Sequence, residues 1–293
     1  MERRALGSTG IVVPALGLGA GRIGGPEIDE AGVERLLGRA LDLGVNLFDA
    51  ARSYGGAEER LGRHLAHRRG EVVLSTKVGY GVAGVPDWTF EAVARGIDEA
   101  LVRLRTSWID LVHLHSCPRE VLERGEVVQA LLEAVRAGKV RCAAYSGEEE
   151  ALAWATGSGA FGAVQASLSV CDQRVLRGGL PAARSAGMGF LAKRPLADAP
   201  WRFAERPAGD ECEPYWLRLR AMRADPGELP WAEWALRFAA FAPGVSGALL
   251  GTRSLDHLEE AARALARGPL PEEARRAVEQ AFLASDDGWT GRI

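Results

Sequence analysis

Four side chains stand at places in the sequence where together they could move a proton to or from a carbonyl oxygen. Asp49 follows the apolar run 45–48, Tyr54 comes five residues later, and Lys77 and His115 end two further apolar runs. A free phenol has a pKa of about 10, and a neighbouring ammonium group lowers such a pKa by favouring the phenolate. A carboxylate beside the ammonium keeps it charged, and an imidazole can orient a carbonyl or share the proton. The combination predicts a general acid for reducing a carbonyl or, in reverse, for oxidising an alcohol.

The scarcity of lysine adds weight to Lys77. Only three of the 36 basic residues are lysines, namely Lys77, Lys139 and Lys193. Lysine acts as a compact point charge that tunes its neighbours, and the planar arginine side chain is a poor substitute in that role. We therefore expect Lys77 to be present for its ammonium group, whereas Lys139, in a predicted loop, is expected to be incidental.

The elements that must position these residues alternate between short apolar runs and amphipathic helical segments. Apolar positions recur at i, i+3 and i+4 in segments such as FEAVARGIDEALVRL, and Thr89 and Ser254 are expected helix N-caps. The runs are too short and too apolar for exposed antiparallel strands, so we predict an α/β fold, a (β/α)8 barrel. Residues 1–293 are expected to form this barrel as a single domain.

Eight predicted strands alternate with eight predicted helices. The strands are 16–19, 45–49, 72–76, 109–115, 140–145, 161–165, 189–192 and 247–250. The helices are 30–43, 57–67, 89–104, 125–137, 148–156, 173–186, 229–241 and 254–266.

Three segments fall outside these units. The residues around Ser8 and Gly10 predict a short N-terminal β-hairpin, and 271–283 predict an extra C-terminal helix. Segment 194–227 is long, proline-rich and aromatic, and such a loop is more often functional than idle. A doubly wound nucleotide-binding fold is disfavoured, because no acidic residue ends the second strand about 20 positions after the glycine cluster LGLGAGRIGG.

The composition narrows the class of protein. A formal net charge of −3 gives no electrostatic attraction for nucleic acid or an acidic membrane. No apolar run reaches the roughly 18–20 residues of a membrane helix, and MERRALGSTG has no apolar signal core, so we expect a cytoplasmic protein. The four cysteines lack C-x-x-C spacing and are expected to be reduced thiols.

Several motifs resemble the aldo-keto reductase family over nearly the whole chain. The family's hairpin and first strand are similar to RALGSTGIVVPALGLGAGRIGG, and its Asp-and-Tyr signature is similar to GVNLFDAARSYGGAEERLG. Its lysine strand is similar to LSTKVG, and its histidine strand is similar to TSWIDLVHLH. VRAGKVRCAAYSG and GALLGTRSLDHLEEA are similar to its fifth strand and closing cofactor segment. The resemblance implies Asp49, Tyr54, Lys77 and His115 as the catalytic tetrad, with Tyr54 as the proton donor.

The resemblance also implies an oxidoreductase that reduces an aldehyde or ketone with NADP, with NAD as the alternative cofactor. Ser146 and Gln165 would hold the nicotinamide carboxamide and select the face that delivers hydride. Arg253 could pair with the 2′-phosphate, since a guanidinium matches phosphate geometry. The residues implied at the cofactor site are Ser146, Gln165, Lys193, Arg194, Leu196, Gly251, Thr252, Arg253, His257 and Glu260.

Three positions depart from the family pattern. Gly147 stands where the family usually has an asparagine that binds the carboxamide, and Ala261 stands for another asparagine near the adenosine. Lys193 falls near the place of an aromatic side chain that stacks on the nicotinamide. We expect one carboxamide hydrogen bond to be lost or taken by water, and Arg194 to stack by its guanidinium plane or to contact the pyrophosphate.

The expected partner is a small-molecule carbonyl or alcohol, with no nucleic acid and no membrane. The predicted substrate pocket is lined by Arg22, Arg52, Trp88 and Trp201. Aromatic walls suit an apolar or ring-shaped carbonyl, and an arginine could read a carboxylate or sugar hydroxyls. The sequence predicts neither one particular substrate nor an oligomeric state.

Two other functions remain open at this stage. His113 and His115 form an H-x-H pair that would face one side of a strand, as in barrel hydrolases that bind a metal. The remaining histidines lie in predicted helices, so no metal ligand is assigned and His113 is expected to be a core residue. Alternatively, the barrel could bind the cofactor without catalysis and act as a regulatory or redox-sensing subunit.

Overall fold

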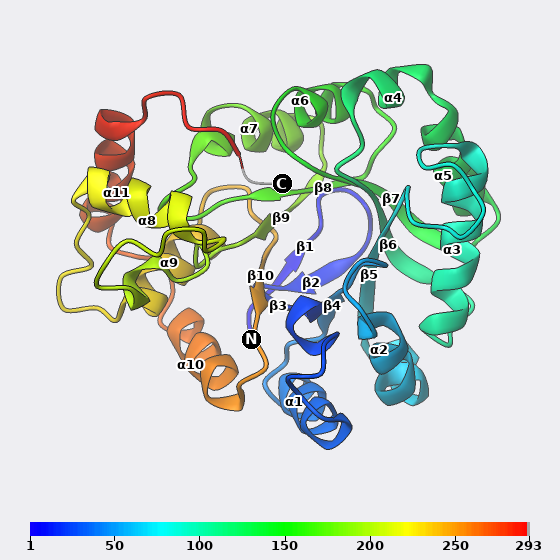
Figure 1. Ribbon diagram of the computed structural model, residues 1–293, viewed down its shortest axis with the longest axis horizontal. Coiled ribbons are helices and arrows are strands. Elements are labelled where there is room, and N and C mark those ends of the chain that lie inside the picture. The colour runs from blue at the N-terminus through cyan, green and yellow to red at the C-terminus, as the bar shows by residue number, and fades with distance from the viewer. Residues whose placement is uncertain (292–293) are drawn as a thin grey trace.

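The computed structural model describes residues 1–291 and shows a closed barrel of parallel strands surrounded by helices (Figure 1). Each barrel strand pairs with its sequence neighbour, and the last pairs with the first. The barrel strands are β3 (Leu16–Gly19), β4 (Leu47–Asp49), β5 (Val73–Val78), β6 (Ile109–His115), β7 (Val140–Ser146), β8 (Ala163–Ser167), β9 (Gly189–Lys193) and β10 (Gly247–Gly251). The predicted (β/α)8 barrel is confirmed.

The predicted hairpin is confirmed and closes one end of the barrel. Strands β1 (Arg3–Ala5) and β2 (Val12–Pro14) pair antiparallel. Leu6 and Val13 are fully buried among core side chains that come from the amino-terminal parts of the barrel strands. The hairpin therefore covers the amino-terminal end, and the opposite end, where the strands finish, is left for the site.

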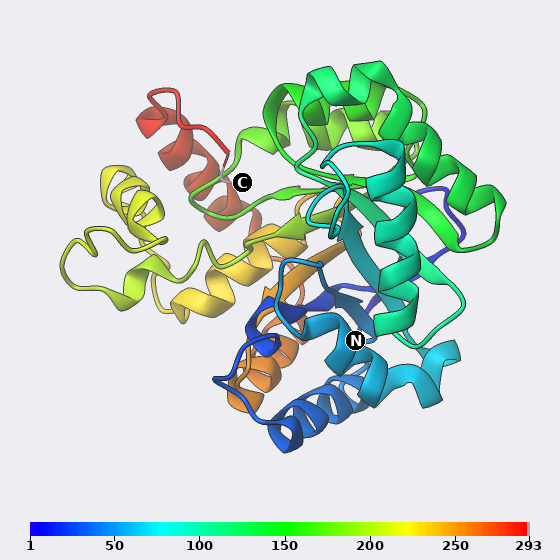
Figure 2. The ribbon, with the colours of Figure 1, turned by 45° about the vertical axis from the view of Figure 1, so that its right-hand side comes forward.

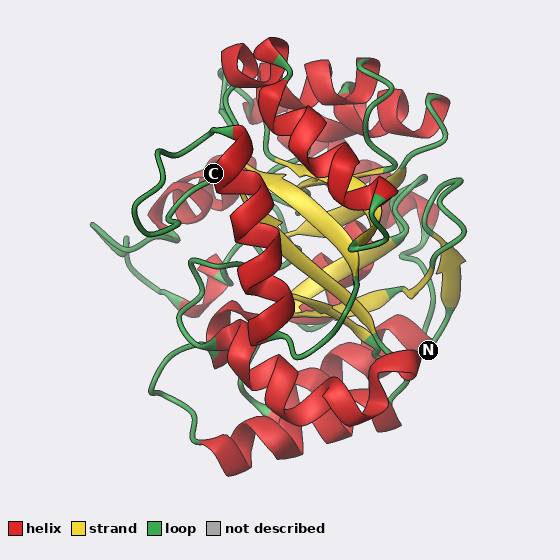
Figure 3. Cartoon of the chain, turned by 90° about the vertical axis from the view of Figure 1, so that its right-hand side faces the viewer, coloured by secondary structure: helices red, strands yellow, loops and turns green. Residues whose placement is uncertain are grey.

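The helices lie outside the strands (Figure 3). They are α1 (Glu30–Asp42), α2 (Ala57–Leu65), α3 (Phe90–Arg103), α4 (Arg119–Arg124), α5 (Glu126–Arg136), α6 (Glu149–Gly157), α7 (Gly179–Ser185), α8 (Glu213–Met222), α9 (Trp231–Ala240), α10 (Leu255–Ala266) and α11 (Glu272–Ser285). Thr89 and Ser254 cap α3 and α10 as predicted, because their side chains accept from the backbone N–H of Ala92 and His257. The extra C-terminal helix is α11.

One helix prediction and one loop prediction were wrong. The segment 173–186 is not one helix, because Gly178 with φ −138° and ψ −85° separates the 3-10 turn Arg174–Arg177 from α7. The segment 194–227 is not a loop throughout, since it contains α8. The buried side of α8 includes the charged Arg218 beside Tyr215 and Leu219, so its apolar periodicity is broken in the sequence.

The end of the described chain lies against the barrel near α6. Helix α11 packs beside α8 at one side of the molecule (Figure 2). From there Thr290 O accepts a 2.7 Å hydrogen bond from Arg218 Nη2, and Gly291 N donates a 2.8 Å hydrogen bond to Glu149 Oε1. Within residues 1–291 we find no helix with the length and apolar character that crossing a membrane requires.

Candidate active site

A buried ion pair joins the ends of β4 and β5. Asp49 is paired with Ser75 in the strand register, so Lys77, two residues further along, lies on the same face beside it. Lys77 Nζ lies 2.6 Å from Asp49 Oδ2 and 2.7 Å from Ala50 O, and Asp49 Oδ1 accepts a 2.6 Å hydrogen bond from Ser75 Oγ. Asp49 and Lys77 are only 4% and 2% exposed, so water does not screen this pair.

The surroundings hold both groups in their charged forms. Burial acts to raise the pKa of Asp49, but the Lys77 ammonium and the His113 ring outweigh it and place that pKa below its ordinary value. Burial acts to lower the pKa of Lys77, but Asp49 and the Tyr54 side chain outweigh it and place that pKa above its ordinary value. The site therefore contains a fixed ammonium group at neutral pH.

Tyr54 and His115 complete the cluster that the sequence predicted. Lys77 Nζ lies 4.9 Å from the centroid of the Tyr54 ring, within the range of a cation–π contact. The Tyr54 and His115 rings meet edge to face with centroids 6.2 Å apart. Residues from β4, β5, β6 and the loop after β4 thus converge at the carboxyl end of the barrel.

His115 has a partner that the sequence analysis missed. Tyr80 Oη lies 2.7 Å from His115 Nδ1, and the two rings stack with centroids 5.4 Å apart. Burial, together with the ammonium groups of Lys77 and Lys193, lowers the pKa of His115 to about 3, so the imidazole is neutral at physiological pH. The only signal in the sequence is that Tyr80 follows Lys77 by three residues in TKVGYG.

His113 lies inside the barrel, where the sequence analysis expected a core residue. It is fully buried, and its Nε2 lies 3.1 Å from Ser75 Oγ, which in turn donates to Asp49. Burial lowers the pKa of His113 to about 4. In the part of the chain that the structure describes, no three His, Cys, Asp or Glu side chains are grouped so as to hold a metal ion.

Ser146 and Gln165 offer unused hydrogen-bonding capacity to a carboxamide. Ser146 Oγ donates a 3.0 Å hydrogen bond to Gln165 Oε1, which turns the other end of this amide away from Ser146. Gln165 Nε2 is buried and has no partner among the described residues. A buried N–H donor without an acceptor is costly and rare, so this amide is suited to a ligand carbonyl. The residues present fit a nicotinamide carboxamide.

Tyr145 leaves no space for a side chain at Gly147, the position where the resemblance led us to expect an asparagine. Tyr145 Oη donates a 3.1 Å hydrogen bond to Cys117 O, and its ring occupies the space that a Cβ at Gly147 would need. We expect Gly147→Ala to lower the free energy of unfolding by about 1–3 kcal/mol, because the buried phenol must move. Chemical denaturation of the wild type, Gly147→Ala and Gly147→Ala/Tyr145→Phe measures this. Tyr145→Phe alone is the reference for the double variant, because it also loses the hydrogen bond to Cys117 O. A cost of Gly147→Ala that is as large in the Tyr145→Phe background, which lacks the closest contact, as in the wild type would contradict the steric explanation.

Lys193 is held by a carboxylate that sequence reasoning also missed. Its Nζ lies 3.1 Å from Glu148 Oε1, and the same oxygen accepts a 2.8 Å hydrogen bond from Ser167 N. Burial lowers the pKa of Lys193, and Glu148 opposes this effect. Arg194 follows with φ 54° and lies 3.5 Å from Asp198. Lys193, near which the resemblance implied an aromatic side chain, thus carries an ammonium group paired with Glu148.

A cavity of about 320 Å³ opens beside Tyr54. Arg22 and Arg253, predicted for substrate and cofactor, both line it, and neither forms an ion pair with any residue in 1–291. Its remaining lining residues are Gly21, Gly24, Gly25, Glu27, Ser53 and Gly55. The lining carries two arginines that form no ion pair with the described residues and one carboxylate, that of Glu27, so its balance of charge still favours an anionic group in this cavity.

The other residues predicted for the cofactor lie at and after the end of β9 and β10. Leu196 is half-buried, Gly251 ends β10, and Thr252 is buried with its Oγ1 accepting from Ser254 N at 3.0 Å. His257 and Glu260 are exposed on the first turns of α10. Together with Arg253, these residues lie along the rim at the carboxyl end of the barrel.

The other predicted pocket residues already have partners in the structure. Arg52 binds Glu99 at 2.5 Å and donates to Gly81 O at 2.7 Å. Trp88 meets Tyr80 edge to face at 5.6 Å. The Trp201 ring stacks on the Trp231 ring of α9 with centroids 5.7 Å apart. Among the described residues, Trp201 therefore packs on α9, whereas Trp88 packs on Tyr80.

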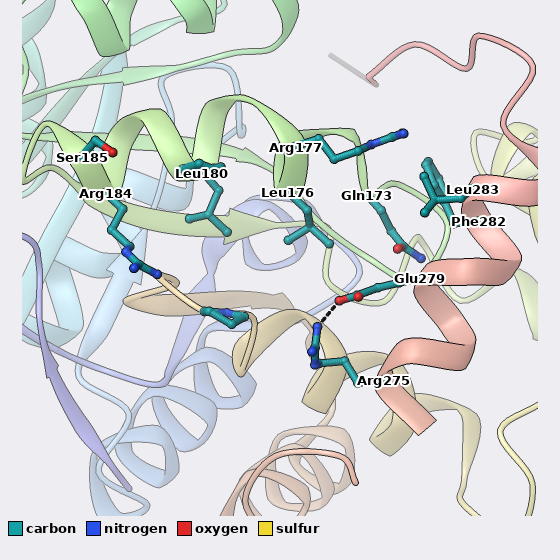
Figure 4. Close-up of a pocket in the computed structure, with 12 residues that line it drawn as sticks. Gln173, Leu176, Arg177, Leu180, Arg184, Ser185, Arg275, Glu279, Phe282 and Leu283 are labelled. Atoms are coloured by element: carbon teal, nitrogen blue, oxygen red, sulfur yellow. Dashed lines mark hydrogen bonds and ion pairs between the residues drawn. The ribbon is translucent and has the colours of Figure 1, made fainter. Parts of the chain in front are cut away.

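A second cavity, of about 480 Å³, lies between α7 and α11, outside the barrel (Figure 4). Leu176, Leu180 and Phe282 form its apolar part, and an ion pair joins Arg275 to Glu279 at its edge. None of the residues predicted for the site lines it. The predicted site residues therefore lie apart from this cavity.

Comparison with known proteins supports the resemblance. The model of the aldo/keto reductase family matches residues 15–282. L-galactose dehydrogenase of Arabidopsis thaliana is 32% identical over 212 residues, which cover 67% of this chain and 66% of that protein. Pyridoxal 4-dehydrogenase of Microbacterium luteolum is 28% identical over 317 residues, covering 88% of this chain and 91% of that protein.

A solved structure has the same fold. It is the holo form of aldo-keto reductase AKR11C1 from Bacillus halodurans, which superposes with a TM-score of 0.85 and 24% identity over 96% of both chains. The family match spans all eight barrel strands and includes Asp49, Tyr54, Lys77 and His115. The chain belongs to the aldo/keto reductase family.

Proposed function

We propose that this protein is a nicotinamide-dependent oxidoreductase that interconverts a carbonyl compound and an alcohol, with Tyr54 as the proton donor. The observation that carries the proposal is the buried Asp49–Lys77 pair, whose ammonium group faces the Tyr54 ring at 4.9 Å. Such a fixed positive charge stabilises the phenolate that remains when the proton leaves.

Each member of the cluster has a separate task in this mechanism. Tyr54 donates its hydroxyl proton to the carbonyl oxygen, and Lys77 stabilises the resulting phenolate. Asp49 keeps Lys77 charged and in place through the 2.6 Å contact. The neutral His115 ring directs a nitrogen toward the carbonyl oxygen and orients it for protonation. In the direction of alcohol oxidation, the same groups take the proton back.

The proposed cofactor is NADP. When bound, a reduced nicotinamide supplies the hydride that the protein itself lacks. Gln165 Nε2, which has no partner, and Ser146 Oγ would hold its carboxamide. Arg253 would bind the 2′-phosphate, and the other residues at the rim would hold the remaining parts of the dinucleotide. These are Lys193, Arg194, Leu196, Gly251, Thr252, His257 and Glu260.

The proposed substrate is a small-molecule carbonyl or alcohol that reaches Tyr54 through the adjoining cavity. The two relatives are named as dehydrogenases of a sugar and of pyridoxal, both of which are polar ring compounds. We infer a substrate of similar size, because the cavity beside Tyr54 is about 320 Å³ and must be shared with part of the cofactor.

The proposal is tested first by cofactor binding. Titration with NADPH and NADH, followed by quenching of tryptophan fluorescence, is expected to show tighter binding of NADPH. Arg253→Ala is expected to weaken NADPH about 10–100-fold and NADH less than about threefold, because only NADPH carries the 2′-phosphate. Arg263→Ala is the matched control, since Arg263 is exposed on α10, the helix that follows Arg253, and pairs with Glu259.

The outcomes separate the parts of the proposal. Equal loss of NADPH and NADH on Arg253→Ala would place that arginine at another part of the dinucleotide. Failure of both nucleotides to bind below millimolar concentrations would remove the cofactor site. Tight NADPH binding without turnover of any carbonyl in a broad panel would favour a non-catalytic, regulatory barrel.

A further inference from the structure

Tyr80 is packed on two sides and cannot turn freely. Its ring stacks on His115 with an interplanar angle of 25°, and the Trp88 ring meets it edge to face at 62°. Its hydroxyl lies 2.7 Å from His115 Nδ1 and 3.3 Å from Ser53 Oγ. The side chain therefore holds one nitrogen of the imidazole and leaves Nε2 without a partner among residues 1–291.

The loop that carries Tyr80 is tied to the loop after β4. Trp88 N donates to Gly79 O at 2.7 Å, and Gly81 N donates to Asp87 Oδ1 at 2.8 Å, which closes the loop on itself. Arg52 donates to Gly81 O at 2.7 Å and binds Glu99 on α3. Arg52 thus links the loop of Tyr54 to the loop of Tyr80.

Two arrangements of hydrogens are compatible with these distances. In the first, Tyr80 donates to His115 Nδ1 and accepts from Ser53, so the imidazole proton is on Nε2. In the second, His115 Nδ1 donates to Tyr80, and Tyr80 donates to Ser53, so Nε2 carries no proton. The two arrangements differ in which proton occupies the shorter contact, so the strength of the hydrogen bonds decides between them.

The distances favour the first arrangement. The phenol is the strongest donor in the group, and the first arrangement places its proton in the 2.7 Å bond to the imidazole nitrogen. The second would place that proton in the 3.3 Å contact with Ser53. The lowered pKa of His115 makes the ring neutral, which leaves one ring nitrogen as an acceptor in either arrangement, so the choice rests on the two distances.

We propose that Tyr80 is a positioning residue that fixes the tautomer of His115, so that Nε2 carries the proton and donates it in a hydrogen bond to the carbonyl oxygen of the substrate. No proton is transferred by this bond. The inference rests on the proposed function for its consequence, but the tautomer itself is a property of the protein without substrate. The other tautomer would present a lone pair to the carbonyl oxygen and repel it.

The tautomer can be measured directly. Long-range ¹H–¹⁵N spectra of ¹⁵N-histidine protein distinguish a protonated from an unprotonated ring nitrogen, and His115→Gln assigns His115 among the five histidines. In the wild type we expect Nε2 of His115 to be protonated. In Tyr80→Phe, which keeps the stacked ring and removes the hydroxyl, we expect the Nδ1 resonance to shift and the other tautomer to become populated. Tyr145→Phe is the matched control and should leave His115 unchanged.

Kinetics give the second readout. Tyr80→Phe is expected to lower kcat about tenfold, the usual effect of one hydrogen bond, with the Kd for NADPH within about twofold. A wild-type spectrum with Nδ1 protonated, or a Tyr80→Phe spectrum identical to the wild type, would overturn the proposal. If the protein reduced no carbonyl compound, the proposed oxidoreductase function would be contradicted. The spectra would still show whether Tyr80 fixes the tautomer of His115.

Discussion

Replacing Tyr54 with phenylalanine is expected to lower kcat for carbonyl reduction about a thousandfold while leaving the Kd for NADPH within about twofold. The variant keeps the ring that packs between Lys77 and His115 and removes only the hydroxyl that donates the proton. Uncatalysed protonation by water would account for any residual rate. Single-turnover reduction of an aldehyde panel by enzyme-bound NADPH measures this loss, and fluorescence titration measures the binding.

The control for this variant is another Tyr-to-Phe change. Tyr145→Phe removes a buried hydroxyl that binds Cys117 O, and it is expected to keep kcat within about threefold. A Tyr54→Phe enzyme with more than a tenth of the wild-type kcat would rule out Tyr54 as the proton donor. His115 would then be the next residue to test, because it is the neighbouring polar side chain.

Replacing Lys77 with methionine is expected to reduce both activity and stability. The variant leaves Asp49 buried without its ammonium partner, and loss of one member of a buried pair costs about 3–5 kcal/mol. Activity should fall about a thousandfold or more, since the positive charge beside Tyr54 is lost. Chemical denaturation gives the free energy of unfolding, and kcat is measured at a temperature where the variant is folded.

A double variant separates the two effects of Lys77. Asp49→Asn in the Lys77→Met background removes the unpaired carboxylate, so it is expected to recover about 1–3 kcal/mol of the lost stability. Activity should not recover, because the ammonium group is still absent. A double variant that regained activity would show that Lys77 only stabilises the fold. A double variant no more stable than Lys77→Met would contradict the account of Asp49 as an unpaired buried charge.

The structural roles of strand ends could be predicted because they follow from local pattern. In a barrel of parallel strands, every strand finishes at the same end. A residue that ends an apolar strand, such as Asp49 or His115, is therefore placed at the carboxyl end of the barrel. The same argument placed Ser146 and Gln165 on adjacent strands, and the structure joins them by a 3.0 Å hydrogen bond. Helix α8 was not predicted from the sequence, because Arg218 on its buried side interrupts the apolar periodicity.

The pairing of side chains from different loops could not be predicted in this way. Glu148 follows β7 and Lys193 ends β9, and the pairing of both strands with β8 brings the two side chains within 3.1 Å. Arg52 was predicted for the substrate pocket, and nothing in the sequence indicated its contacts with Glu99 on α3 and the carbonyl of Gly81. Such partners depend on where a long side chain turns, which sequence periodicity does not encode.

The sequence by itself determined the barrel, the hairpin and the convergence of Asp49, Tyr54, Lys77 and His115, because apolar period and strand order fix which residues share the carboxyl end. Only the tertiary structure decided that Tyr80 holds His115 and that Tyr145 fills the space beside Gly147. Both depend on contacts between neighbouring strands and loops, where available volume and hydrogen-bond distance select the partner.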